Sequence, residues 1–227
     1  DDSGIEKFNN VIIGHTRLSI IDLKTKAANQ PVVSSSSLLA FNGMIYNYKE
    51  IRNILKKNNI FDGNSDTEVL AKCLDQWGVQ KTLKNIDGMF AFAWFCKKKR
   101  EIYLVRDHMG EKPLYWVKKN NSIYFSSEIK SFFEIEDISK SPNIDLIHDY
   151  FYTLKISGSK TMYSEINEVE PGSVIKISTV TGSISSISYF SLEDTFHKEV
   201  FTSNKIDELE SIFEEIISSR TISDVPL

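Results

Sequence analysis

Short apolar runs of the kind that form β-strands dominate the first two thirds of the chain. They cover residues 11–21, 38–41, 89–96, 101–106, 114–117 and 123–126. Because several of these runs are separated by gaps of turn length, the pattern predicts antiparallel hairpins and meanders. The run MFAFAWF at 89–95 is apolar at consecutive positions, which predicts a strand buried between two layers. Further along the chain, strands are expected at 173–178 and 184–190.

Helical spacing of apolar residues predicts two helices that cover this sheet. The first carries Tyr48, Ile51 and Leu55, and the second has an apolar stripe between residues 69 and 77. The second is preceded by SDTE at 65–68, which has the form of a capping box and predicts the start of that helix. Later helices are expected at 145–154 and, after a polar linker at 202–204, at 206–217.

Composition excludes several classes of function. The 27 basic and 31 acidic residues give a net charge of −4, which implies no general attraction to nucleic acid or to an anionic membrane. No apolar run approaches the roughly 18 residues that span a bilayer, and no signal peptide is visible, so we expect a cytoplasmic protein. The two cysteines and four histidines have neither disulfide-framework nor zinc spacing, so no metal is predicted.

Three polar features stand out from the apolar pattern: Arg17, the pair Asn42-Gly43, and Asp66. Each has a structural explanation, as an ion-pair partner, a tight hairpin turn and an acidic residue in the first turn of a helix. As a set they match the groups of a free amino acid. A guanidinium suits an α-carboxylate, a carboxylate suits an α-ammonium, and an amide NH₂ beside a glycine N–H can hold an oxyanion. The set predicts binding of an amino acid and attack on its side-chain carbonyl.

Six motifs, in this order along the chain, carry a family resemblance: GHTRLSIIDL, FNGMIYNY, SDTEVL, GMFAFAWF, RDHMGEKPLY and FSSEIKSF. They resemble the glutaminase domain of glutamine-hydrolysing asparagine synthetases, which are class II amidotransferases with an N-terminal nucleophile fold. The resemblance implies an α+β fold, a four-layer αββα sandwich of two antiparallel sheets. It also implies an amidotransferase domain over residues 1–195, truncated at its start, and a linker and first helix of a truncated synthetase domain over 196–227.

The resemblance implies a glutamine site made of Arg17, Leu18, Ser19, Ile20, Ile21, Asn42, Gly43, Met44 and Asp66. In it Arg17 binds the α-carboxylate, the backbone of 18–21 lines the pocket, and Asp66 holds the α-ammonium. Asn42 and the N–H of Gly43 form the oxyanion hole and are the catalytic groups. Met44 departs from the family, which usually has Glu after Asn-Gly. Little changes if only the backbone at this position touches glutamine, whereas glutamine affinity suffers if the carboxylate orders nearby groups.

The family's nucleophile is a cysteine at the mature N-terminus, upstream of the segment that the first residues of this chain resemble. Neither Cys73, on the apolar stripe of its helix, nor Cys96, at the end of a core strand, is expected to replace it. The chain by itself is therefore expected not to hydrolyse glutamine. The motifs around His108 and Glu128 are assigned to loop architecture and to the interface with the next domain, with His108 as a packed loop residue rather than a general base.

The implied partners are glutamine and a C-terminal synthetase domain that receives ammonia, with aspartate as the expected acceptor. A homodimer is allowed, and no nucleic acid or membrane is expected. No cofactor is expected in this fragment, because ATP and Mg²⁺ belong to the missing synthetase domain. Ile212, Phe213 and Ile216 of the last helix are then expected to be exposed. Two alternatives stay open: a binding or scaffold domain without glutaminase activity, and an amidotransferase acting on another carboxylate such as a cell-surface sugar.

Overall fold

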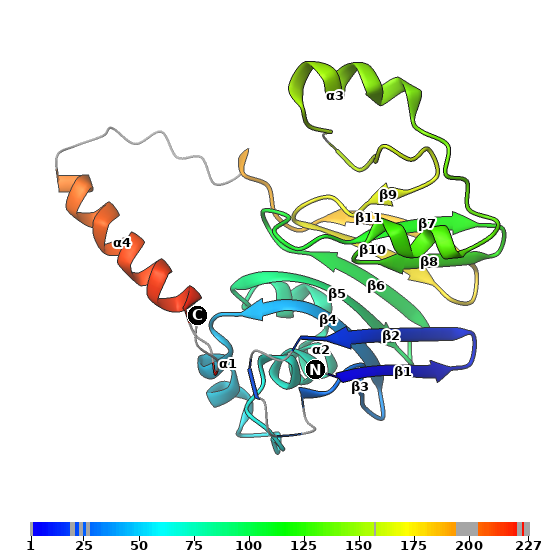
Figure 1. The fold of residues 1–227 in the computed structure, drawn as a ribbon. Coiled ribbons are helices and arrows are strands. Elements are labelled where there is room, and N and C mark those ends of the chain that lie inside the picture. The colour runs from blue at the N-terminus through cyan, green and yellow to red at the C-terminus, as the bar shows by residue number, and fades with distance from the viewer. Residues whose placement is uncertain are drawn as a thin grey trace.

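A six-stranded antiparallel sheet forms the centre of the protein (Figure 1). The computed structural model describes residues 2–18, 21–22, 25, 28–156, 158–193, 204–221 and 224. The strand order is β11-β10-β6-β5-β4-β3, with bounds β3 Val32–Val33, β4 Ser37–Ile45, β5 Gly88–Cys96, β6 Glu101–Arg106, β10 Ser173–Ser178 and β11 Ile184–Ser188. Phe90, Phe92 and Trp94 of β5 belong to one buried cluster, while the alternate residues Ala91 and Phe95 belong to another. The prediction that this strand is buried on both faces is confirmed.

Two helices cover one face of this sheet, α1 (Tyr48–Leu55) and α2 (Asp66–Leu83). The start of α2 lies where the capping motif predicts it, because the Ser65 hydroxyl accepts the Glu68 N–H at 3.1 Å. The Glu68 side chain, the second member of the predicted capping box, has other partners. The Glu68 carboxylate accepts the N–H groups of Asp62 and Gly63, at 2.9 and 3.1 Å, and so fastens the preceding loop to the helix.

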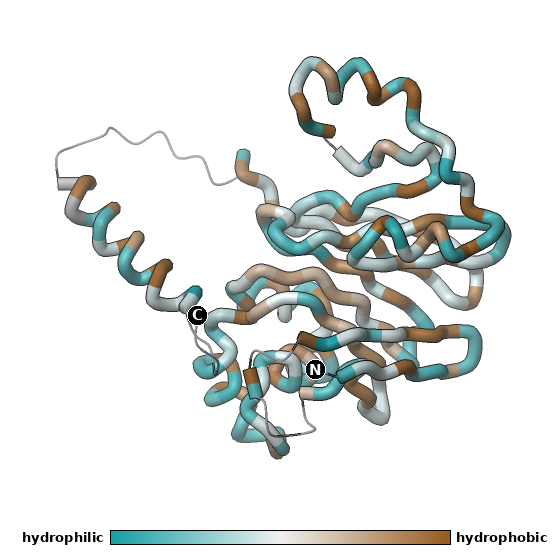
Figure 2. The backbone as a smooth tube through the Cα atoms, in the orientation of Figure 1, coloured by the Kyte–Doolittle hydropathy of each residue, from teal (hydrophilic) through white to brown (hydrophobic). Residues whose placement is uncertain are grey.

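A second layer of strands covers the other face of the central sheet (Figure 1). It consists of the hairpin β1 (Asp2–Phe8) and β2 (Val11–Arg17), and of a three-stranded sheet in the order β8-β7-β9. In that sheet β7 is Tyr115–Lys119, β8 is Ser122–Ser126 and β9 is Asn167–Glu168. The 3₁₀ helix η2 (Ile129–Glu134) packs on β7 and β8 through Phe132. The tube in Figure 2 shows the hydrophobic positions gathered where these layers meet.

The strand bounds differ from expectation around the candidate site. The strand predicted for 11–21 ends at Arg17, because Arg17 turns back to bind the carbonyls that follow it. The turn predicted at Asn42-Gly43 is wrong, since both residues lie inside β4, which continues to Ile45 paired with β5. The extended β1 was not predicted, because its sequence DSGIEKF has few apolar residues.

The helices α3 (Ile147–Thr153) and α4 (Asn204–Arg220) lie outside the layers of the sandwich (Figure 1). The predicted helix at 145–154 appears as η3 (Ile144–Leu146) followed by α3. Figure 1 shows α4 beside the sandwich, approaching it at its C-terminal end. Its residues Ile212, Phe213 and Ile216 are 45%, 56% and 40% exposed, which confirms the expectation. Most of the predicted linker, like the predicted boundary at residue 195, lies outside the described residues. No helix within the described ranges is long and apolar enough to cross a membrane.

Candidate active site

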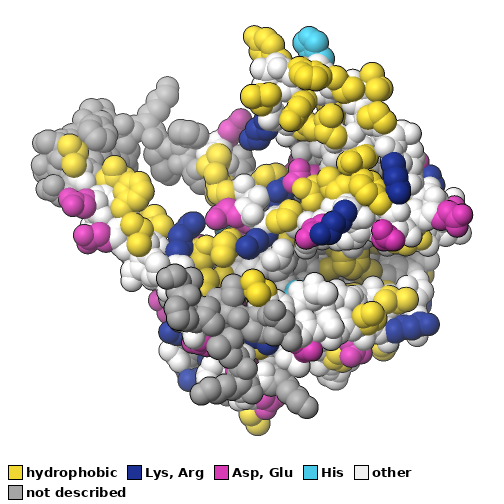
Figure 3. Space-filling view, in the orientation of Figure 1, with side chains coloured by type: hydrophobic (Ala, Val, Ile, Leu, Met, Phe, Trp, Pro, Cys, Tyr) yellow, Lys and Arg dark blue, Asp and Glu magenta, His cyan; other side chains and the backbone are white. Residues whose placement is uncertain are grey.

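One cavity of about 710 Å³ collects the residues singled out in the sequence. Figure 3 shows the surface hollowed between the β1–β2 hairpin and the β7–β8 hairpin, whose residues line it. The predicted residues that line this cavity are Arg17, Leu18, Ile21, Asn42, Gly43, Met44 and Asp66. They come from three separate segments of the chain. Ser19 and Ile20, also predicted for this site, lie outside the described residues.

Gly43 lies where two strands meet backbone to backbone. It pairs with Phe90 of β5 and has a φ of +150°, and a Cβ added to it would lie 2.1 Å from the Met89 carbonyl oxygen. Two positions along the ladder, a Cβ on Gly88 would lie 2.2 Å from the Met44 carbonyl oxygen. Only glycine fits at such a separation. The pair Asn42-Gly43 is therefore held in a rigid strand rather than in a turn.

Gln30 fixes the strand residue that precedes this pair. Its Nε2 donates to the Phe41 carbonyl at 3.0 Å, and its Oε1 accepts the Phe41 N–H at 2.7 Å. The side chain is buried and lines the cavity, so it replaces a neighbouring strand at that point of β4. The Asn42 amide also lines the cavity, with its Nδ2 at 3.5 Å from the Ser127 hydroxyl. Sequence reasoning missed Gln30, because no local pattern distinguishes it from a loop glutamine.

Arg17 is held in place at the end of β2 by the chain that follows it. Its Nη2 donates to the carbonyls of Ile21 and Asp22, at 2.7 and 3.1 Å. Asp22 has a positive φ of 55°, and its carboxylate accepts the N–H groups of Thr25 and Asn64 at 3.1 and 2.6 Å. These bonds leave the half-buried guanidinium on the cavity wall, where it can meet an anionic group of a ligand.

Asp66 is a buried carboxyl on the cavity wall at the first position of α2. Its Oδ2 accepts the Ile45 N–H at 3.0 Å, and its Oδ1 accepts the Thr67 N–H at 2.9 Å. Burial raises the pKa of Asp66 to about 6, against the lowering effects of these hydrogen bonds and of the Arg17 charge. The group is thus an anion at neutral pH and a neutral acid below about pH 6.

Met44 and His15 give the cavity an apolar and uncharged part. Met44 is buried with Ile21 and Tyr46, and Met89 packs against them. His15 is half-buried, and burial is the main cause that lowers the pKa of its imidazole, with the Arg17 charge adding to it. The ring is therefore neutral at pH 7, and its Nδ1 makes no hydrogen bond to the described residues. His15 was not predicted as a site residue.

The RDHMGEKPLY motif forms a loop fastened by two buried side chains. Asp107 accepts the N–H groups of Phe90, Met109, Glu111 and Lys112 at 2.8–3.1 Å. Arg106 forms an ion pair with Glu168 at 2.8 Å and donates to the carbonyls of Gly110, Lys112 and Val169. This network places Lys112 on the cavity wall.

His108 packs edge to face against Phe90, Tyr189 and Phe190 and does not line the cavity. These contacts agree with the interpretation of His108 as a packed loop residue.

Neither cysteine of the chain lines the cavity. Cys73 is fully buried in the core between α2 and the sheet, where burial raises the pKa of its thiol to about 12. Cys96 ends β5, opposite Ser37 and Glu101. Within the described part of the chain, no group of three or more histidine, cysteine or acidic side chains could hold a metal ion.

Comparison with known proteins points to one family. A family described as a glutamine amidotransferase domain matches residues 1–190. "Asparagine synthetase [glutamine-hydrolyzing] 3" of Bacillus subtilis is 26% identical over 236 residues, covering 100% of this chain and 37% of that protein. A putative asparagine synthetase of Methanocaldococcus jannaschii is 30% identical over 250 residues, covering 100% of this chain and 47% of that protein. The chain thus spans less than half the length of these two relatives.

Solved structures support the same architecture. Glutamine phosphoribosylpyrophosphate amidotransferase from B. subtilis superposes with a TM-score of 0.56 at 21% identity, covering 79% of this chain and 35% of that chain. The allosteric regulatory enzyme of purine biosynthesis gives a TM-score of 0.57 at 23% identity with the same coverage. At this level of identity the likeness concerns the fold, and it agrees with the predicted α+β sandwich of N-terminal nucleophile type.

Proposed function

Because this chain belongs to the glutamine amidotransferase domain family, we propose that its cavity binds L-glutamine and stabilises attack on the side-chain amide. One observation carries the proposal. Arg17, Asp66 and the pair Asn42-Gly43 come from separate segments and line a single cavity. These are a cation for the α-carboxylate, an anion for the α-ammonium and two donors for an oxyanion.

In the proposed reaction these groups have distinct tasks. Arg17 and Asp66 bind the two charged ends of the amino acid, whose charges are the same before and during reaction. The Asn42 amide and the Gly43 N–H receive the carbonyl oxygen as a nucleophile adds to the amide carbon and negative charge develops. Collapse of the tetrahedral adduct breaks the C–N bond, the nitrogen takes a proton and ammonia leaves. Water then releases glutamate from the acyl adduct and restores the nucleophile.

The nucleophile in this proposal comes from outside the described residues, as a cysteine that precedes them. The structure offers a place for such a segment. Among the described strands, β2 pairs with β1 and β8 pairs with β7, so each has one free edge. A second cavity of about 190 Å³ lies between these edges, lined by Ile12, Gly14 and residues 123–126, and it adjoins the first. A strand inserted there would join the two parts of the second layer.

The fate of the ammonia is a further part of the proposal. We propose that it amidates aspartate, because the two curated relatives are called glutamine-hydrolysing asparagine synthetases. In this proposal the amidation takes place in an ATP- and Mg²⁺-dependent synthetase domain of the same protein. Aspartate is the acceptor favoured over another carboxylate because both relatives are called asparagine synthetases. Among the described residues no cysteine lines the cavity, and this observation favours the alternative of an inactive scaffold.

Glutamine binding by the 227-residue chain tests the proposed site, because it needs no nucleophile. Calorimetry should show saturable binding of L-glutamine that weakens in Arg17→Ala and Asp66→Ala and is unchanged in Lys99→Ala, a charge on the distant β5–β6 turn. A chain that binds no glutamine, or variants that bind it equally well, would overturn the proposal. Glutamate release by the protein extended upstream then separates the enzyme from the scaffold. A cysteine after the initiator methionine and measurable release support the enzyme.

A further inference from the structure

Arg220 and Asp224, which follow the region that the family match covers, contact residues beside the cavity. We propose that Asp224 and Arg220 are positioning residues for the glutamine site, which they hold in its binding conformation from the segment following residue 190. The inference rests on the proposed function and assigns to this segment a part in glutamine binding.

Asp224 acts on the loop that positions Arg17. Its Oδ2 accepts the N–H of Asp22 at 2.8 Å, while the carbonyl on the other side of the same residue accepts Nη2 of Arg17 at 3.1 Å. Asp22 has a positive φ, a conformation that is uncommon for a residue with a side chain and persists where its surroundings hold it. The carboxylate of Asp224 therefore helps to fix the backbone that orients the guanidinium.

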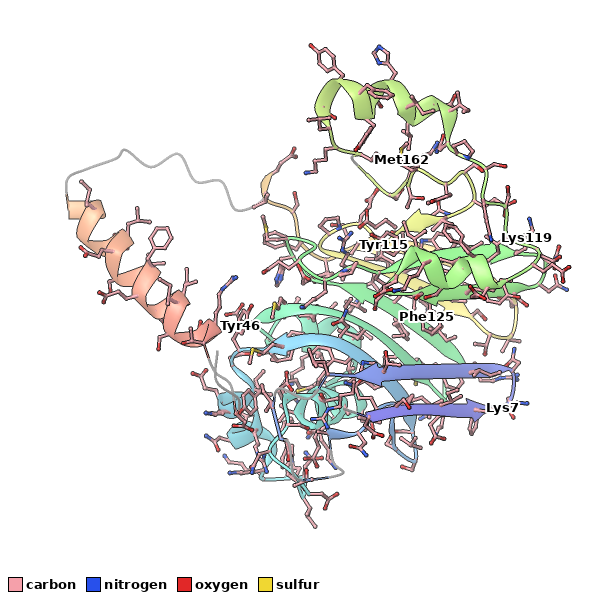
Figure 4. All side chains as sticks on the ribbon, viewed as in Figure 1. Lys7, Tyr46, Tyr115, Lys119, Phe125 and Met162 are labelled. Atoms are coloured by element: carbon pink, nitrogen blue, oxygen red, sulfur yellow. The ribbon has the colours of Figure 1, made fainter. Side chains whose placement is uncertain are left out.

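Arg220, at the last position of α4, contacts residues that neighbour the cavity wall. Its guanidinium lies over the ring of Tyr46 at 5.1 Å, and its Nη1 lies 3.5 Å from the Glu111 carboxylate. Figure 4 shows Tyr46 at the end of α4. Tyr46 packs with Met44 of the cavity wall, and Glu111 precedes Lys112 on that wall. Because Arg220 and Glu111 are both substantially exposed, their ion pair is weak, and the Asp224 contact carries the larger effect.

The two contacts together join the last described residues to three segments beside the cavity. Asp224 reaches the loop after β2, and Arg220 reaches the end of β4 and the loop after β6. The rest of α4 presents exposed apolar residues and gives the segment little other anchorage on the sandwich. A movement of α4 would therefore change the position of Arg17 through the contact between Asp224 and Asp22.

Calorimetry with L-glutamine on the 227-residue chain tests the inference. Asp224→Ala should raise the Kd for glutamine about tenfold, the effect of losing one hydrogen bond to a charged group. Asp224→Asn, which keeps an acceptor oxygen, should restore most of the affinity. Glu215→Ala, at an exposed acidic residue of α4, is the matched control and should leave the Kd unchanged. The midpoint of thermal unfolding should be the same in all three variants.

A double-mutant cycle separates positioning from a general structural role. Arg17→Lys replaces the planar guanidinium by an ammonium, which cannot form two parallel hydrogen bonds to a carboxylate. In that background Asp224→Ala should weaken glutamine binding little further. Equal loss in both backgrounds, or an unchanged Kd in Asp224→Ala, would overturn the inference. Hydrogen exchange gives a readout that needs no ligand, because the Asp22 amide should exchange faster in Asp224→Ala. If the unaltered chain binds no glutamine, the proposed function fails, and an Asp22 amide unaffected by Asp224→Ala refutes the inference separately.

Discussion

Replacement of Gly43 by alanine should destabilise the protein severely, because two backbones meet at this position. The added Cβ would lie 2.1 Å from the Met89 carbonyl oxygen and 2.7 Å from the Phe90 Cα. Both are main-chain atoms of the central strand β5, which has a neighbour on each side and cannot move away alone. The φ of +150° adds strain that an alanine bears and a glycine does not.

The size of the effect follows from these two terms. A residue held in a sparsely populated backbone region costs about 1–3 kcal/mol. Overpacking of a well-packed interior costs about another 1–3 kcal/mol. The sum of about 2–6 kcal/mol is a large part of the roughly 5–15 kcal/mol that stabilises an ordinary domain. For a domain of this size it should lower the midpoint of thermal unfolding by about 4 °C or more.

Gly14→Ala is the matched control, since Gly14 also lies in a strand and lines the same cavity. A Cβ there would lie 3.5 Å from the Ile5 side chain, an ordinary contact, and should change stability by less than about 1 kcal/mol. Both variants are compared by thermal and urea unfolding, followed by circular dichroism. Equal stability of the two variants would show that β4 and β5 do not meet as closely as the structure has them, and would refute the reasoning.

Five further predictions concern the site, the buried thiol of Cys73 and nucleotide binding. In the protein extended upstream, Asn42→Ala should lower kcat by about 10²- to 10³-fold, whereas Arg17→Lys should mainly raise KM. Steady-state kinetics measures both parameters. If the two variants changed the same parameter to the same degree, the proposed roles would be wrong. The Kd for glutamine should rise as pH falls below about 6, where Asp66 becomes neutral, and Asp66→Asn should bind weakly with a flat calorimetric pH profile. The pKa of Asp66 is higher in the folded chain than in the unfolded chain, where it is about 4, so protonated Asp66 contributes to the free energy of unfolding. This contribution is complete below about pH 4 and is lost as pH rises through about 6. Urea unfolding of Asp66→Asn and of the unaltered chain at several pH values would reveal it. Cys73 should resist iodoacetamide in the folded chain, and rapid labelling in native mass spectra would contradict its burial. Calorimetry with Mg-ATP should show no micromolar binding to this chain.

The strands and helices could be predicted largely because their patterns are local. The unbroken apolar run of β5 indicates burial on both faces, and the stripe of α2 with its Ser65 cap indicates where that helix begins. The prediction of a turn at Asn42-Gly43 was wrong for a physical reason. Asn-Gly favours a turn where the chain is free to choose, but here the absence of a side chain serves a close approach of two strands. Sequence alone does not distinguish these two uses of glycine.

The groups that fix the backbone around the cavity were harder to predict than the groups that we propose bind the ligand. Arg17, Asn42 and Asp66 stand out because their chemistry is unusual among apolar neighbours. Gln30 and Asp107 act on backbone atoms far away in the sequence, at Phe41 and Phe90, and these pairings exist only after the sheet has formed. The contact between Asp22 and Asp224 joins residues 202 positions apart in the sequence, and no local sequence pattern predicts it.

Met44 changes how charge is arranged in the proposed glutamine site. Where the family that the sequence resembles usually has Glu, this chain has a thioether packed with Ile21, Tyr46 and Met89. Among the described residues, the acidic side chains on the cavity wall are then Asp66, which is buried, and Glu128, which is exposed and lies 2.6 Å from the exposed Lys130 ammonium. Asp66 is thus the carboxylate left to meet an α-ammonium, and because burial raises its pKa, its charge depends on pH near 6. In the proposed site, recognition of the ammonium would therefore depend on one buried titrating group, and a bound ammonium, which favours the ionised carboxylate, would itself lower the pKa of Asp66.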